Sequence, residues 1–205
     1  MKRFCFMLGF AAVVILSAGS AFADNIAGRF GVTGRLGFLI PADSETTFPP
    51  PTLSIGTDVG FVGGGGFIYG INRDIAAELE VTHTGFDGSI GGIRQGNFET
   101  NNISLGVQYR FKEPIARLTP FAGGGLNILL NNFTFDDGVK TDVDTVAGVH
   151  LTGGVDYFVV KELALTSALK AVLAPDADIS VNGRKIGNFD PMSLSMTFGV
   201  RYFFR

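Results

Sequence analysis

Residues 193–204 read Ser-Leu-Ser-Met-Thr-Phe-Gly-Val-Arg-Tyr-Phe-Phe, and this stretch decides the fold. Its even-numbered positions are all apolar: Leu194, Met196, Phe198, Val200, Tyr202 and Phe204. Its odd-numbered positions begin with Ser193, Ser195 and Thr197, and the single charge, Arg201, lies among them. Strict alternation over this length is typical of a β-strand with one apolar face and one polar face.

Seven earlier segments repeat the same period of two, which gives eight predicted strands. They cover residues 30–40, 61–69, 75–82, 102–111, 118–130, 149–157 and 163–173. The connections alternate between long stretches, at 41–56, 85–98, 132–144 and 174–191, and short turns, at 71–74, 112–117 and 159–162. An even strand count with alternating long and short connections is typical of an outer-membrane barrel. The predicted fold is therefore all-β, a closed antiparallel eight-stranded transmembrane barrel with short periplasmic turns and long extracellular loops.

A soluble sandwich or a lipocalin-like barrel would also alternate, with its apolar face inside. Two features favour the membrane barrel. The polar face is rich in small residues and carries about one charge per strand, which suits a narrow lumen. Aromatic side chains also gather at strand ends on the apolar face, as in interfacial girdles. These aromatics are Phe30, Phe38, Phe61, Tyr69, Phe111, Tyr157, Tyr202 and Phe204.

The first 23 residues form a predicted secretory signal peptide. Lys2 and Arg3 precede an apolar run from Phe4 to Leu16, and Ala21-Phe22-Ala23 is a small-x-small cleavage site. Residues 24–205 are then one barrel domain, exported to the outer membrane. The only cysteine, Cys5, lies in the leader, so we expect no disulfide in the mature chain.

Composition excludes two classes of protein. An apolar content of 46% with only 17% charged residues excludes a disordered chain. A formal net charge of −3 gives no electrostatic basis for binding nucleic acid. The expected partners are instead outer-membrane lipids.

Three short motifs resemble the outer membrane protein W (OmpW) family. Residues 118–127, LTPFAGGGLN, are similar to one family strand, and residues 153–157, GGVDY, to another. The end, with Tyr202 and Phe204, resembles the aromatic C-terminal signal read by the barrel-assembly machinery. Arg205 after the last phenylalanine and the absence of tryptophan are departures from the family pattern. The resemblance implies passive passage of small, mostly hydrophobic molecules. OmpA-like and surface-antigen barrels share the layout, and they would imply a structural or surface-interaction role without transport.

Seven charged residues lie on the inward parity. They are Arg35, Glu78, Glu80, Arg110, Asp156, Lys170 and Arg201. Because an unpaired buried charge is costly, we expect them to pair into one network, with Glu78, Arg110, Asp156 and Arg201 near the periplasmic end. The network either braces a filled lumen or takes part in gating.

Apolar residues occupy the inward parity toward the long-loop end. They are Leu39, Val62, Phe86, Leu129, Val146 and Val172. They either line a hydrophobic vestibule above the charges, from which a solute escapes sideways into the bilayer, or they form packing beneath the loops.

No catalytic or metal site is expected, and no cofactor. His83 lies on the lipid-facing parity, where a lipid A hydrolase or acyltransferase would place a histidine, but Thr84 and Gly85 follow it where a serine would be needed. His150 is inward and is interpreted as a hydrogen-bonding group. Neither histidine has a second one at metal-binding spacing. The acidic stretch Asp136, Asp137, Asp142 and Asp144 is interpreted as a solvated loop.

Overall fold

A computed structural model describes residues 26–42, 44–46, 53–90, 93–111, 117–136, 140–181 and 184–204. The predicted signal peptide, residues 1–23, lies outside this part of the chain. Across the described ranges, no helix has both the length and the apolar character needed to cross a bilayer.

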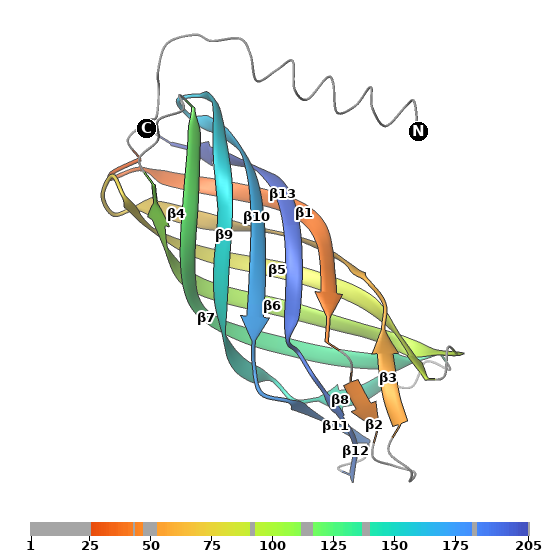
Figure 1. Ribbon diagram of the computed structural model, residues 1–205. Helices are drawn as coiled ribbons and strands as arrows, with labels where there is room; N and C mark the ends of the chain where they lie inside the picture. The colour runs from red at the N-terminus through yellow and green to blue at the C-terminus, as the bar shows by residue number, and fades with distance from the viewer. Residues whose placement is uncertain are drawn as a thin grey trace, which may run out of the picture.

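Eight strands form the wall of the barrel (Figure 1). They are β1 (Phe30–Pro41), β4 (Gly60–Gly70), β5 (Ile75–Ile90), β6 (Ile93–Arg110), β7 (Leu118–Phe135), β9 (Val146–Val160), β10 (Leu163–Leu173) and β13 (Ser193–Phe203). Every neighbouring pair is antiparallel, and the pairing of β1 with β13 closes the ring. The predicted fold class, a closed eight-stranded antiparallel barrel, is confirmed.

Five shorter strands extend the wall at the long-loop end (Figure 1). They are β2 (Ser44–Thr46), β3 (Leu53–Thr57), β8 (Lys140–Val143), β11 (Ala177–Val181) and β12 (Arg184–Phe189). They join the protruding ends of β5 and β7 through the series β5–β3–β2–β12–β11–β8–β7. The expectation of loops throughout 41–56, 85–98, 132–144 and 174–191 is therefore wrong in part. Backbone groups there are satisfied by strand pairing instead.

The two faces of the wall point as the alternation predicts. Leu105, Val107 and Phe198 are 59%, 52% and 52% exposed on the outside, whereas Arg110 and Arg201 are 3% and 0% exposed inside. A soluble β-protein buries its apolar face. This barrel presents its apolar face outward, so its outer surface is suited to the hydrocarbon of a lipid bilayer.

The lumen is filled at both ends by apolar side chains. At the short-turn end, a floor cluster consists of Ile26, Ile68, Ala76, Phe158, Ala164 and Phe203. At the long-loop end, a phenylalanine cluster consists of Phe86, Phe98, Phe133 and Phe189 together with Val143, Ala177 and Ile179. Polar residues occupy the space between these clusters.

Inward glycines allow close approach of neighbouring strands in this part of the barrel. A Cβ atom at Gly64 would lie 2.2 Å from the Val81 carbonyl oxygen, and one at Gly199 would lie 2.8 Å from the Arg35 Cβ. Only glycine allows such a close approach. These glycines therefore let neighbouring strands lie closer together than a side chain would allow.

Candidate functional site

We call the half of the lumen nearer the short turns the lower lumen and the half nearer the long connections the upper lumen. The lower lumen contains a chain of ion pairs that begins at β6. Arg110 contacts Asp156 of β9 at 2.7 Å, and the same Asp156 oxygen contacts Arg201 of β13 at 2.7 Å. Arg201 then contacts Glu78 of β5 at 2.8 Å. These four residues are the ones predicted to meet near the periplasmic end, and the structure brings them together.

The chain continues upward through the remaining three predicted charges. Arg35 of β1 lies 2.7 Å from Glu78 and 2.8 Å from Glu80. Lys170 of β10 forms the last ion pair with Glu80. The seven charges thus alternate in sign from Arg110 to Lys170, so every carboxylate is held between two cations. We call this series the charge chain.

Neutral groups complete the charge chain. The Nε of Arg201 donates to the Thr33 hydroxyl at 3.0 Å, and its guanidinium carbon lies 5.6 Å from the centre of the Phe121 ring. The Gln108 amide donates to Glu78. A buried charge is tolerated when it is both paired and hydrogen-bonded, and these contacts add neutral hydrogen bonds to Arg201 and Glu78. Six strands supply the seven charges, so the chain cross-braces the barrel.

The histidines take different places. The His150 ring is buried in the lumen, with Nδ1 at 2.5 Å from the Asn127 Oδ1. The Asn127 amide donates to Asn102 at 2.8 Å. His83 lies on the outer face, 3.0 Å from Asn101. Over the described residues, no three His, Cys, Asp or Glu side chains form a group suited to a metal ion.

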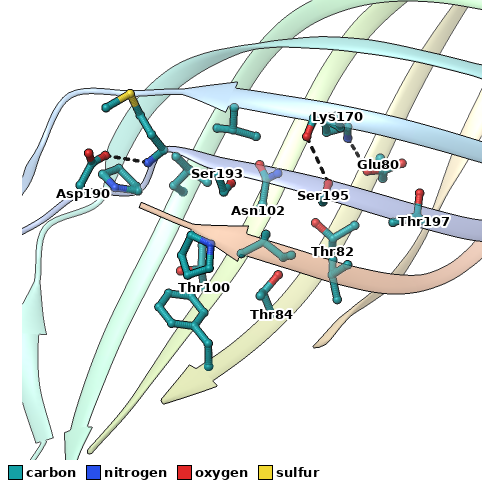
Figure 2. A pocket seen from close by; sticks show the side chains of 18 of the residues that line it. Glu80, Thr82, Thr84, Thr100, Asn102, Lys170, Asp190, Ser193, Ser195 and Thr197 are labelled. Atoms are coloured by element: carbon teal, nitrogen blue, oxygen red, sulfur yellow. Dashed lines mark hydrogen bonds and ion pairs between the residues drawn. The ribbon is translucent and has the colours of Figure 1, made fainter. Parts of the chain in front are cut away.

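A cavity of about 40 Å³ lies between the charge chain and the phenylalanine cluster (Figure 2). Five of the six predicted vestibule residues line it: Leu39, Val62, Phe86, Leu129 and Val172. The sixth, Val146, packs against the phenylalanine cluster instead. The volume has room for roughly three water molecules, so the upper lumen is not an open aqueous pore.

The lower wall of the cavity is a band of hydroxyl and amide groups that the sequence analysis missed. Figure 2 shows Thr82 and Thr84 from β5, Thr100 and Asn102 from β6, and Ser195 and Thr197 from β13 around this space. The available signal was the run of small polar residues on the inward parity of these strands.

The wall beside the cavity is interrupted between β10 and β13. The ladder between these strands ends at the pair Val172 and Ser193, and the β11–β12 ladder begins again at Ala177 and Phe189. Residues 174–176 and 190–192 lie between the two ladders, and we call them the seam. Each side contains a proline, Pro175 or Pro191, which has no N–H to donate.

The seam is held by a few specific contacts. The Asp190 carboxylate accepts a hydrogen bond from the Met192 N–H at 2.8 Å, and the Ala42 N–H donates to the Met192 carbonyl at 2.9 Å. Asp190 lies in the connection before β13. Burial raises the pKa of its carboxyl group, and the nearby Asp176 raises it further, although the Met192 hydrogen bond acts the other way.

Met192 lines two spaces at once. It is part of the cavity wall, and it also lines an apolar groove on the outer surface with Leu126, Val149, Leu173 and Pro175. The seam therefore separates the cavity from the lipid-facing surface by about one side chain. Sequence analysis missed Phe189 and Pro191, which lie in the connection expected at 174–191, and Met192, which follows it directly.

The predicted assembly residues lie at the short-turn end of β13. Tyr202 and Phe204 are exposed on the outer face, and their ring centres are 5.2 Å apart. The Phe204 N–H donates to the Phe30 carbonyl at 2.7 Å, and Arg29 donates to the carbonyls of Phe203 and Phe204. The two rings are therefore displayed from a fixed strand end.

Comparison with known proteins places the fold in one structural class. No family model and no curated protein matches the chain. Among solved structures, the outer membrane protein OprG from Pseudomonas aeruginosa is similar, with a TM-score of 0.68 and 17% identity over 87% of this chain and 97% of that one. Neisserial surface protein A has a TM-score of 0.54 and 14% identity, over 88% and 99% of the two chains. The E. coli Outer Membrane Protein W has a TM-score of 0.51 and 17% identity, over 87% and 98%.

These likenesses establish the architecture. The chain has the fold of the eight-stranded outer-membrane barrels.

Proposed function

We propose that the protein is an OmpW-like passive conduit of the outer membrane for small, mostly apolar molecules. A solute would occupy the cavity above the charge chain and leave sideways through the seam into the bilayer. The proposal includes export by the predicted signal peptide, folding by the barrel-assembly machinery through Tyr202 and Phe204, and no enzymatic activity.

The observation that carries the proposal is the position of Met192. Met192 lines both the interior cavity and the apolar groove outside, and no ladder joins residues 174–176 to residues 190–192 beside it. Opening a continuous ladder would break backbone hydrogen bonds in hydrocarbon, which is costly. At the seam the main requirement is a rotation of one flexible side chain.

The lower lumen supports a sideways exit over a vertical one. The charge chain and the floor cluster fill the barrel below the cavity, and Asp156 and Arg201 are both fully buried. An apolar solute moving toward the short-turn end would have to separate buried ion pairs, and it could form no hydrogen bond or ion pair with the separated charges. The route to the lipid is shorter and apolar.

Solute uptake by cells that express the protein tests the proposal. Cells lacking it and cells expressing it would be compared for the initial rate of n-hexane uptake, with the amount of folded barrel measured from its shifted band on unboiled gels. Faster uptake only with the folded protein supports the conduit. Equal rates at equal lipid composition would contradict it.

A surface-interaction role is the second candidate, supported by the five short strands beyond the barrel rim. Paired strands there form an extended wall instead of loose loops. Such a wall offers a fixed surface to an external partner. Binding of an external partner that is lost on removal of β11 and β12 would support this role, and because Phe189 of β12 also lines the cavity, it is this binding, not solute uptake, that distinguishes the two candidates.

A further inference from the structure

We infer that a groove at the turn between β9 and β10 is a binding site for one inner-leaflet phospholipid with a phosphoethanolamine head group. The inference goes beyond the conduit and does not depend on it. The groove includes Phe158 of the floor cluster, so it lies at the short-turn end, away from the cavity in the upper lumen.

The groove combines three charged residues with apolar ones. Its volume is about 250 Å³, and it is lined by Arg117, Lys161, Glu162, Phe158, Val159 and Val160. Val159 and Val160 are both exposed. The volume exceeds what the roughly eight heavy atoms of a phosphoethanolamine group need. The groove can therefore hold a lipid head group.

The end of β9 places the groove at the level of the lipid head groups. Tyr157 is a residue of the aromatic girdle and pairs with Leu165 of β10. The register between β9 and β10 shifts directly after this level, and Val159 is the extra residue. Aromatic girdles mark the boundary between hydrocarbon and head groups. The residues that follow Tyr157 toward the short turn therefore lie among the head groups.

The backbone of all three charged residues is held by neighbouring segments. An N–H of β9 donates to the Arg117 carbonyl at 2.7 Å, and an N–H of β13 donates to the Glu162 carbonyl at 2.7 Å. The Arg29 guanidinium donates to the Lys161 carbonyl at 3.1 Å. A site whose backbone is fixed before the ligand arrives loses less conformational freedom on binding. The groove is preorganised in this sense.

Arg117 adopts a backbone conformation that glycine would adopt more easily. Its φ is +76°, and among the described residues it is the one residue other than glycine with a positive φ. This left-handed region is unfavourable for a residue with a Cβ atom. A residue kept in such a conformation points to a function of its side chain. A guanidinium and an ammonium that line one groove suit a phosphate group.

The charges of the groove match a zwitterion better than an anion. Arg117 and Lys161 can donate to a phosphate, and Glu162 can accept from a primary ammonium. A phosphatidylglycerol head group has no cation for Glu162. A choline head group has a cation but no N–H to donate. An ethanolamine head group satisfies both signs of charge in the groove.

Native mass spectrometry of the full barrel in detergent tests the assignment. The barrel is mixed with equal amounts of phosphatidylethanolamine, phosphatidylglycerol and phosphatidylcholine that share the same acyl chains. The first lipid bound should be phosphatidylethanolamine, with an apparent Kd about threefold to fivefold below those of the other two. Amide NMR locates the site, because the Lys161 and Glu162 signals should shift and saturate with this lipid. The signals of Arg73 and Asp74, a matched cation and carboxylate in the turn before β5, should not.

Two variants separate the two signs of charge. Glu162→Gln should remove the preference for ethanolamine over glycerol head groups, and Lys161→Gln should weaken binding of all three lipids about threefold. Arg73→Gln and Asp74→Asn are the matched controls and should bind like the unaltered chain. Tightest binding of another lipid, equal binding of all three, or an unchanged preference in Glu162→Gln would each overturn the inference. Equal effects of Lys161→Gln and Arg73→Gln would do so as well.

Discussion

The two halves of the lumen share the same strands but solve different physical problems. Below, seven charges from six strands form a continuous alternating chain without space for a solute. Above, hydroxyl, amide and apolar side chains surround a cavity beside an interrupted ladder. The comparison shows that the half of the lumen that is closed and the half that contains the cavity are lined by different kinds of side chain. Buried ion pairs hold the wall together, and neutral groups leave a space that can be filled and emptied.

The largest expected effect is on the centre of the charge chain. Arg201→Leu leaves Glu78 and Asp156 each with one cation fewer, and should lower the free energy of unfolding by about 3–5 kcal/mol. Urea unfolding of the barrel in vesicles, followed by the shifted gel band, measures this. Arg73→Leu, an exposed cation in the turn between β4 and β5, is the control and should change stability by less than about 0.5 kcal/mol. Equal effects of the two variants would show that the charge chain does not brace the barrel.

A smaller loss is expected at the end of the chain. Arg110→Ala removes one of the two cations at Asp156 and leaves Arg201 in place, so it should cost about 1–3 kcal/mol. In a planar bilayer the variant should remain closed, because the floor cluster still fills the short-turn end. A new ion-conducting state would indicate that the charges gate a vertical path, contrary to a bracing role.

Substitutions in the seam should change the rate of solute uptake more than they change the free energy of unfolding. Met192→Ala removes the side chain shared by the cavity and the groove, and should raise the uptake of a small apolar solute severalfold. Met192→Trp fills the same place and should lower it. Met196→Ala changes a methionine on the lipid-facing side of β13 and should leave uptake unchanged. Identical uptake rates for the two Met192 variants would show that the solute does not pass Met192.

The smallest effect on stability is expected in the hydroxyl band. Thr84→Val with Thr197→Val breaks no hydrogen bond within the described chain and should change the free energy of unfolding by less than about 1 kcal/mol. The same urea titration checks this. A loss as large as that of Arg201→Leu would show that the upper lumen is also a brace, and the contrast between the halves would fail.

Much of this architecture could be predicted from the sequence because period-two alternation fixes which face each side chain occupies. The inward position of Arg35 or Asp156 follows from strand parity, and their pairing follows from the cost of leaving a charge alone. The phenylalanine cluster and the seam could not be predicted in the same way. Phe189, Pro191 and Met192 lie in a stretch without regular alternation, and their positions depend on pairing between segments far apart in the chain.

The most direct test of the central claim, a sideways exit at Met192, is reversible blocking of the seam. The only natural cysteine, Cys5, lies in the predicted leader, so Met192→Cys introduces the one thiol of the mature chain. Uptake of n-hexane would be measured before and after attachment of a bulky methanethiosulfonate group, and again after reduction, with Met196→Cys as the matched control. The account predicts that modification at position 192 reduces uptake to the level of cells without the protein, that reduction restores it, and that modification at position 196 has no effect. Undiminished uptake with position 192 fully modified would contradict the account.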